Sequence, residues 1–270
     1  MPELPEVETI ANGVHQRIHG QTILSVWTSN KPQTFKSPPD QVIEGLTKSR
    51  IDRVHRVGKT IVVDLIRDQQ QTQFLIHLGM TGRLLVSTPD TPVPPHTHAI
   101  LSLSAGRELR FVDARRFGRL SITAPGTPYE GPGAEPLTIR LEDFIALFRK
   151  RKTPIKAALL NQSLLHGVGN IYADEALFHA GIRPLRHAGR LTRAELTRLR
   201  AALIKVMTAA IKLGGSSVSD YVDADGVAGF FQLHHHVYSR TGQPCRICKT
   251  PIKRIVVAGR GTHFCPNCQR

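Results

Sequence analysis

Four cysteines near the end of the chain have the spacing of a metal site. Cys245 and Cys248 form one CxxC pair, and Cys265 and Cys268 form a second pair after sixteen intervening residues. Two such pairs bring four thiolates to one tetrahedral ion, and zinc is the metal that this ligand set favours. Iron or a redox-active cysteine pair is the alternative. Because protein would fill every coordination position, the pattern predicts one structural Zn²⁺ ion and not a catalytic one.

The chain around these cysteines carries charge of one sign. From residue 226 to residue 270 there is no Asp or Glu. The same stretch contains these cations: Arg240, Arg246, Lys249, Lys253, Arg254, Arg260 and Arg270. A solvated surface usually mixes both signs, so the stretch indicates phosphate contact, with a merely basic tail as the alternative.

The whole chain is also strongly basic. Its 270 residues include 36 Lys and Arg against 21 Asp and Glu, a formal net charge of +15. This excess favours a polyanionic partner, nucleic acid above all, with a solvated basic surface as the alternative. No stretch approaches 18 apolar residues and the first residues lack a secretory signal. We therefore expect no membrane partner and a cytoplasmic location.

The first half of the chain has the pattern of a β domain that follows one helix. Apolar residues after Pro5 fall at helical spacing, and Gly20 would end the helix: Val7, Ile10, Val14 and Ile18. From residue 23 to residue 122 short β-rich runs alternate with turns: TILSVW, IDRVHRV, TIVVDLI, QFLIHL, GRLLVS, AILSLS, ELRFVD and RLSIT. Many short strands with turn signals are typical of an antiparallel sandwich or barrel.

The second half is helical and ends in the cysteine module. The Pro/Gly-rich segment 124–136 indicates a boundary, and helical patterns follow at 141–151, 155–165 and 192–213. Thr192 and Glu195 have capping-box spacing. We predict a β domain at 1–124, a linker at 125–139, a helical domain at 140–232 and a zinc finger at 233–270.

Several short motifs fit contact with DNA, although each has an ordinary structural explanation. In HGVGN, the glycines before Asn170 allow a tight turn that exposes N–H groups to a phosphate, and Asn170 is a natural helix N-cap. A plain connection between helices explains the motif equally well. Lys59 lies in a GKT turn between two strands, where a simple hairpin lysine is the alternative.

Three residues suggest a way to stabilise DNA from which one base has been extruded: Met80, Arg115 and Phe117. Met80 lies in HLGMTGRL between two glycines, and the other two lie in DARRFGRL. Side chains of these types, exposed near DNA, can fill the space that a flipped base leaves. Burial of Met80 and Phe117 in the core is the alternative.

Five stretches in this order resemble one family: MPELPEVET, HLGMTG, DARRFG, GVGNIYADE and GRGTHFCPNCQ. The chain resembles the bacterial formamidopyrimidine-DNA glycosylases over essentially its whole length. The resemblance implies an α+β multidomain fold, with an N-terminal antiparallel β-sandwich flanked by helices. A helix–two-turn–helix domain with a zinc-finger β-hairpin would follow. It also implies a monomeric DNA glycosylase and AP lyase of base excision repair, acting on double-stranded DNA with oxidised bases or abasic sites.

The resemblance also assigns the chemistry. Pro2 would be the nucleophile through its α-nitrogen, once Met1 is removed, and Glu3 would be the general acid. Lys59 would contact phosphate and assist elimination. Arg260 would grip a phosphate beside the lesion and assist δ-elimination.

The remaining family positions concern DNA binding. Met80, Arg115 and Phe117 would fill the gap in the duplex, and Asn170 would share the phosphate grip. His96 and Arg151 match further DNA-contacting positions. Residues 215–231 match the loop that closes over the everted base.

An N-terminal proline suits this chemistry for a physical reason. An amine that attacks C1′ must be unprotonated, and an α-amine with a pKa near 7.7–8.0 is about 10–15% neutral at pH 7. An ordinary lysine is about 0.04% neutral at the same pH. A proline imine is also a permanent cation, which acidifies the C2′ proton and promotes loss of the 3′ phosphate.

The sequence departs from the family pattern before the zinc module. His235 and Ser239 stand where the family usually has Leu and Gly. His234, His235 and His236 suggest a second metal site. Adjacent side chains of a strand point to opposite faces, however, so three in a row cannot converge. We therefore expect these histidines to contact solvent or DNA.

Two other functions compete with this interpretation. An endonuclease VIII-like glycosylase for oxidised pyrimidines would share the terminal proline, the adjacent Glu and the zinc hairpin. The PELPEVE start and the separation of Met80 from Arg115 and Phe117 favour the purine enzymes instead. A non-catalytic binder of damaged DNA, with Pro2 and Glu3 inert, is the second alternative.

Overall fold

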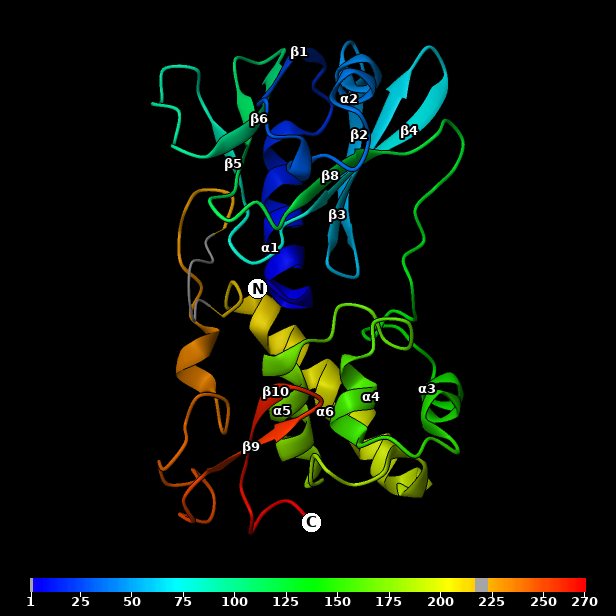
Figure 1. The fold of residues 1–270 in the computed structure, drawn as a ribbon, viewed down its shortest axis with the longest axis vertical. Helices are drawn as coiled ribbons and strands as arrows, with labels where there is room; N and C mark the ends of the chain where they lie inside the picture. Colours follow the sequence, from blue (N-terminus) through cyan, green and yellow to red (C-terminus); the bar gives the residue numbers. More distant parts are fainter. Residues whose placement is uncertain (1, 217–222) are drawn as a thin grey trace. The chain divides into compact units, whose positions relative to one another are not determined.

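The computed structural model describes residues 2–216 and 223–270. The chain folds as two compact units (Figure 1). The first comprises Met1–Glu130 and Gly214–Phe230, and the second comprises Gly131–Leu213 and Phe231–Arg270. The segment 214–230 therefore returns to the unit that the first half of the chain builds.

The first unit is built on two four-stranded antiparallel sheets. One sheet has, in spatial order, β1 (Ile23–Thr28), β6 (Thr97–Leu103), β7 (Glu108–Val112) and β5 (Arg83–Ser87). The other has, in spatial order, β2 (Arg50–Val57), β3 (Thr60–Arg67), β4 (Gln70–His77) and β8 (Arg119–Ile122). Each of the eight β-rich runs of the sequence forms one of these strands. Buried apolar residues alternate with partly exposed ones in β4 and β6, whereas β3 and β7 are buried along most of their length.

Helix α1 (Leu4–Ile18) packs against both sheets, with contacts to β2, β3 and β5 (Figure 1). Its buried face is the predicted one, and these side chains join the core: Val7, Ile10, Val14 and Ile18. Helix α2 (Pro39–Leu46) was not predicted from the sequence, because two consecutive prolines, Pro38 and Pro39, usually interrupt regular secondary structure. Pro39 in fact occupies the first helical turn, which tolerates proline because its N–H needs no partner.

The second unit is mainly helical. Its helices are α3 (Leu141–Phe148), α4 (Ile155–Leu160), α5 (Asn170–Ala180) and α6 (Arg193–Lys212). Short 3-10 turns are η2 (Ala188–Arg190) and η3 (Phe231–His234), and η1 (Pro32–Thr34) lies in the first unit. The predicted capping box begins α6, with the Thr192 hydroxyl accepting from the Glu195 N–H at 3.2 Å and Glu195 accepting from the Thr192 N–H at 2.8 Å.

Helix α5 is the centre of the second unit, in contact with α4, α6 and the strand Arg260–Phe264 near the end of the chain. Strands β9 (Lys253–Val257) and β10 (Arg260–Phe264) form an antiparallel hairpin. The turn between them has positive φ at Ala258 and Gly259, the conformation that matches the twist of a two-residue hairpin. The two sheets, the helical unit and this hairpin confirm the predicted α+β fold class. None of the helices within 2–216 and 223–270 combines the length and apolarity that a membrane span requires.

Candidate active site and nucleic-acid contacts

The start of the chain is buried and hydrogen-bonded. Pro2 and Glu3 are both buried, and Glu3 is the N-cap of α1. The Glu3 N–H donates to Oε2 of Glu6 at 2.8 Å, and Oε1 of Glu6 accepts from the Ser216 N–H at 2.8 Å. The Glu6 carboxylate therefore fixes both the cap of α1 and the beginning of the 214–230 segment. A terminus that is usually frayed is held in place here.

Lys59 lies in the tight turn between β2 and β3, with Gly58 at positive φ. The buried Arg56 guanidinium donates from Nη1 to the Gly58 carbonyl at 3.1 Å and from Nε to Oε2 of Glu8 at 2.7 Å. Glu8 belongs to α1, so this contact ties the Lys59 hairpin to the helix that follows Pro2 and Glu3.

The surface near this hairpin is electropositive. A pocket on the β2–β3–β4–β8 sheet includes Lys36, His77, Phe117 and Arg119. Burial lowers the pKa of His77, and three nearby cations lower it further: Lys59, Lys36 and Arg119. Three cations around one pocket give this surface a positive potential, which suits a phosphate.

Met80 and Phe117 are not core residues: 42% and 48% of their surfaces are exposed. The guanidinium of Arg115 lies 4.7 Å from the centre of the Phe117 ring. The backbone of Gly79 packs so closely on the second turn that an added Cβ would lie 2.5 Å from the Gly118 nitrogen. The structure thus brings the two predicted turns together, although they are far apart in the sequence.

Asp113 organises both turns, and the sequence analysis assigned it no role. It is fully buried, and Oδ1 accepts from the Thr81 hydroxyl at 2.6 Å. Oδ2 accepts from the Gly118 N–H at 2.7 Å, and Oδ1 lies 3.3 Å from the Arg115 N–H. A buried carboxylate that accepts hydrogen bonds from two turns fixes the position of one turn relative to the other. An Asp directly after a β-rich run was the only signal available in the sequence.

His96 and Arg151 are both exposed but lie in different units. His96 has a positive φ of 65°, and its carbonyl accepts from the Asp113 N–H at 3.0 Å. Its position is therefore coupled to the Arg115–Phe117 turn. Arg151 follows α3, and its carbonyl accepts from the Gly189 N–H at 2.8 Å.

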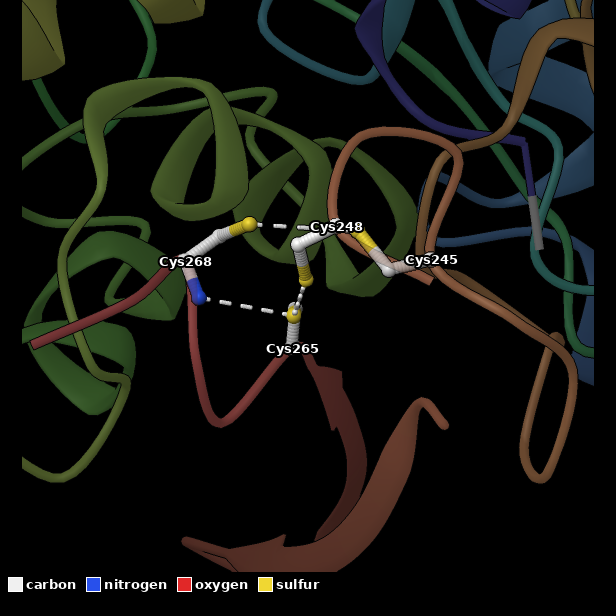
Figure 2. A group of neighbouring side chains, drawn as sticks. All are labelled: Cys245, Cys248, Cys265 and Cys268. Atoms are coloured by element: carbon white, nitrogen blue, oxygen red, sulfur yellow. Dashed lines mark hydrogen bonds between the residues drawn. The ribbon is translucent and has the colours of Figure 1, made fainter. Parts of the chain in front are cut away.

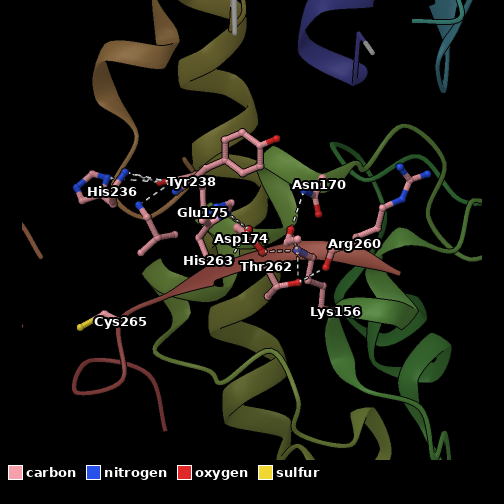
Figure 3. Close-up of polar contacts among 12 residues, drawn as sticks. Lys156, Asn170, Asp174, Glu175, His236, Tyr238, Arg260, Thr262, His263 and Cys265 are labelled. Atoms are coloured by element: carbon pink, nitrogen blue, oxygen red, sulfur yellow. Dashed lines mark hydrogen bonds and ion pairs between the residues drawn. The ribbon is translucent and has the colours of Figure 1, made fainter. Parts of the chain in front are cut away.

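Asn170 and the β9–β10 hairpin are joined in the second unit (Figure 3). The N-cap of α5 is Gly169, so the prediction that Asn170 is the N-cap is wrong. The glycine takes the extended cap conformation, which leaves the Asn170 amide free to reach the hairpin. Its Nδ2 donates to the Gly261 carbonyl at 2.9 Å, next to the exposed Arg260.

A buried ion pair fixes the same hairpin. Lys156 Nζ lies 2.6 Å from Oδ1 of Asp174, and neither side chain is exposed. Lys156 also donates to the Thr262 hydroxyl at 2.7 Å, and Oδ2 of Asp174 accepts from the His263 N–H at 2.8 Å (Figure 3). The pair therefore joins α4, α5 and β10. The pair was not predicted from the sequence, because a lysine in the otherwise apolar α4 and an acid in α5 do not by themselves indicate that the two side chains meet.

The four cysteines converge as predicted (Figure 2). The Sγ atoms of Cys245 and Cys268 are 3.9 Å apart, and those of Cys248 and Cys265 are 3.4 Å apart. Four sulfurs 2.3 Å from a tetrahedral zinc ion would be about 3.8 Å apart, so the cluster fits zinc.

The surroundings of these thiols also fit zinc. Hydrogen bonds from Thr250 and Asn267 lower the pKa of Cys248 to about 5, whereas burial raises the pKa of Cys265 and Cys268. The Cys248 thiolate is thus ready to bind an ion, and binding would release protons from its partners. The predicted structural zinc is confirmed in its ligand set.

The histidine triplet differs from the prediction. His235 is buried, with its ring against Phe231 at 5.6 Å and Tyr238 at 5.5 Å, and burial lowers its pKa. His236 stacks on Phe178, and only His234 is exposed. The expectation of solvent or DNA contact is therefore wrong for His235. The backbone turns here instead of running as a strand, so alternation does not apply.

The predicted base-capping loop 215–231 falls partly on residues 217–222, which lie outside the described residues. Of the remainder, Ala224 joins the core of the first unit, and its carbonyl accepts from the Val86 N–H at 3.2 Å. Asp225 forms an ion pair with Arg17. Ala224 and Asp225 therefore anchor this segment on the β-sandwich unit.

Comparison with known proteins identifies the family to which this architecture corresponds. Three family models match successive parts of the chain. The formamidopyrimidine-DNA glycosylase N-terminal domain matches residues 1–120, and the formamidopyrimidine-DNA glycosylase H2TH domain matches residues 131–222. The zinc finger found in FPG and IleRS matches residues 242–270.

Whole-chain relatives agree with these matches. A formamidopyrimidine-DNA glycosylase of Solibacter usitatus is 44% identical over 271 residues, covering 100% of both chains. The Lactococcus lactis FPG mutant G226P, solved with DNA that contains Fapy-dG, has a TM-score of 0.91 at 35% identity, again covering 100% of both chains. MutM in complex with DNA that contains carbocyclic 8-oxo-G has a TM-score of 0.89 at 35% identity and the same coverage.

The fold and the three matched modules define a DNA glycosylase with an N-terminal β-sandwich, a helical H2TH domain and a zinc finger. The chain belongs to the formamidopyrimidine-DNA glycosylase family. The family resemblance and enzyme class predicted from the sequence are confirmed.

Proposed function

We propose that this chain removes oxidised purines from double-stranded DNA as a bifunctional glycosylase and AP lyase, with 8-oxoguanine and formamidopyrimidines as substrates. The observation that carries the proposal is the buried start of the chain. Pro2 lies beside Glu3, whose N–H is held by the Glu6 carboxylate at 2.8 Å. Such a rigid terminus suits a backbone nitrogen that must meet one sugar carbon.

Pro2 and Glu3 divide the first half of the reaction. After loss of Met1, the nitrogen lone pair of Pro2 attacks C1′, and the bond from C1′ to the base breaks with its electron pair leaving on the base. The attacking nitrogen gives up its own proton to the departing base. Its lone pair then expels O4′ as the bond from C1′ to O4′ breaks, and Glu3 donates a proton to O4′, which leaves a cationic iminium between Pro2 and C1′.

The iminium promotes the second half of the reaction, in which both phosphates are eliminated. Its positive charge stabilises the electron pair left when the C2′ proton departs, and the 3′ phosphate is then expelled. A second elimination expels the 5′ phosphate, with Lys59 and Arg260 assisting. The product is a gap of one nucleotide with phosphate at both ends.

The remaining residues hold the DNA. Exposed Met80, Arg115 and Phe117 replace the extruded base in the stack, and the close packing of their turns supports this role. Asn170 and Arg260 grip the phosphates beside the lesion, with Lys59, His96 and Arg151 as further contacts.

The zinc ion would be held by Cys245, Cys248, Cys265 and Cys268 and would stabilise the finger without taking part in the reaction. We retain the boundaries 1–124, 125–139, 140–232 and 233–270 as the functional division of the chain, with 215–231 as the base-capping loop. Because its substrate is chromosomal DNA, the protein would work at the bacterial nucleoid, and the family resemblance implies that it does so as a monomer.

Excision from matched duplexes tests the proposal. Duplexes that contain 8-oxoguanine, a formamidopyrimidine or thymine glycol would be compared under single-turnover conditions. We expect the two oxidised purines to be removed fastest, each leaving phosphate at both ends of the gap. Faster removal of thymine glycol would assign the chain to oxidised pyrimidines instead, and binding without base release would make it a damage-binding protein.

A further inference from the structure

A second cluster of metal-ligating side chains lies on α5, separate from the four cysteines. Glu175 and His179 are four residues apart on this helix, so both side chains project from one face. His236 approaches the same face from the segment that follows η3. One ligand atom from each of the three lies within 4.8 Å of the other two.

The carboxylate of this cluster is fixed before any ion binds (Figure 3). Glu175 is 1% exposed and accepts the backbone N–H groups of residues 236, 237 and 238 at 2.9–3.1 Å. Burial disfavours its charge, but the neighbouring His236 imidazole and the hydrogen bonds from these N–H groups lower the pKa of Glu175 overall. Hydrogen-bonded carboxylates of this kind are characteristic of metal sites, because they hold the ligand in one orientation.

Two imidazoles complete the cluster. Nδ1 of His236 lies 3.6 Å from Oε2 of Glu175, and its ring stacks on Phe178 with centres 5.3 Å apart. The His179 ring meets the His236 ring edge-on, with centres 4.5 Å apart. Two imidazoles in contact repel each other when both are protonated, whereas one divalent cation can bind both.

The cluster is accessible from solvent. His179 is exposed and His236 is partly exposed, so an ion can enter without opening the core. Burial and the neighbouring His236 lower the pKa of His179, which favours the neutral imidazole that binds metals.

We propose that Glu175, His179 and His236 form a second metal site, for a divalent transition-metal ion of the zinc class. Imidazole nitrogens about 2.0–2.1 Å from a tetrahedral ion lie about 3.4 Å apart, and the ligand atoms here lie within 4.8 Å of one another, so small side-chain rotations would bring them to that spacing. Three protein ligands leave a coordination position for water, unlike the closed site of the zinc finger.

An ion in this site would join α5 to the chain that leads into the zinc finger. Val237, next to His236, packs in one cluster with Phe178, Cys245 and Cys265. The ion would therefore add a cross-link beside the core of the finger and raise its resistance to unfolding.

Zinc titration of the full chain, with the zinc of the finger already in place, tests the proposal. A chromophoric chelator would compete for Zn²⁺, and the variants His179→Ala and His236→Ala would be compared with His234→Ala. We expect each of the first two variants to bind one equivalent fewer than the wild type, or to bind it at least tenfold more weakly. The His234→Ala variant should match the wild type, because His234 lies outside the cluster.

Because His179 is exposed, we expect the His179→Ala variant to fold, so the test stays decisive even if His236→Ala does not fold. Retention of the same equivalents and affinity by His179→Ala would overturn the proposal. An equal loss in His234→Ala would overturn it too, because the binding would then reflect exposed histidines in general. Neither result depends on DNA cleavage, so the outcome is independent of the proposed glycosylase function.

Discussion

Lys156 and Asp174 form an ion pair with no exposed surface, 2.6 Å from Nζ to Oδ1, between α4 and α5 of the helical unit. Both side chains also form hydrogen bonds with β10: Lys156 donates to the Thr262 hydroxyl, and Asp174 accepts from the His263 N–H. The strand that they fix begins with Arg260, which the proposed function assigns to a phosphate. The buried pair thus fixes the strand that carries Arg260.

Breaking this pair should be costly. Asp174→Asn leaves the Lys156 ammonium buried without its counter-ion, so we expect a loss of about 3–5 kcal/mol in the free energy of unfolding. The double variant Lys156→Met/Asp174→Leu should lose less, because no charge remains buried. Urea denaturation measures both. A loss below about 1 kcal/mol in Asp174→Asn would show that the pair does not hold the hairpin.

Gly79 should be required for base excision because of its contact with the Phe117 turn. Gly79→Ala places a Cβ 2.5 Å from the Gly118 nitrogen at a φ of +62°, so we expect a loss of at least about 2 kcal/mol in stability and slower excision. Gly106→Ala is the matched control, with a φ of +67° and open space around it. It should cost about 1 kcal/mol and leave excision unchanged. Equal excision rates in the two variants would contradict this account.

Glu195 should make stability depend on pH. Its hydrogen bond with Arg186, reinforced by the Thr192 contacts, lowers the pKa of Glu195 to about 2. A lowered pKa gives stability that is fully present above the unfolded value, near 4.3, and is lost as the pH falls towards 2. We expect Glu195→Gln to cost about 1 kcal/mol at pH 7 and distinctly less at pH 3.5, by urea denaturation.

Glu142→Gln is the control for this measurement. Glu142 and Arg193 form an exposed ion pair, which contributes little to the free energy of unfolding. A difference between wild type and Glu195→Gln that stays constant from pH 7 to pH 3.5 would rule out the capping carboxylate as the titrating group.

Loss of the zinc should affect DNA binding and leave the β-sandwich intact. Cys265→Ser removes one of four ligands and should release the β9–β10 hairpin that carries Arg260. We expect DNA affinity to fall at least tenfold and its salt dependence to weaken, because fewer phosphates are neutralised. The β content seen by circular dichroism should stay the same. Equal loss of β-structure would contradict the division into two units.

The sequence predicted the strands and the cysteine site well, for physical reasons. Short β-rich runs between turns and CxxC spacing are local patterns, so β1 to β8 and the four thiols could be predicted without knowing their partners in the fold. The buried polar contacts could not be predicted, because each joins residues that are far apart in the sequence. Asp174 pairs with Lys156 and accepts a hydrogen bond from His263 only after the chain has folded. The same holds for Asp113, which accepts hydrogen bonds from Thr81 and Gly118.

Backbone conformation explains the two local errors. Whether Gly169 or Asn170 caps α5 depends on dihedral angles that the residue types alone leave open. The histidine triplet was treated as a strand, but His235 and His236 follow a 3-10 turn, which directs one ring into the core and the other towards Glu175.

The central claim is that the nitrogen of Pro2 forms a covalent bond with the sugar, and borohydride trapping tests it most directly. Reduction during the reaction of wild-type protein with 8-oxoguanine duplex should give a stable protein–DNA adduct. Pro2→Gly, or protein that retains Met1, should give little or none. A wild type that releases the base yet never traps, or a Pro2→Gly variant that traps equally well, would contradict the claim.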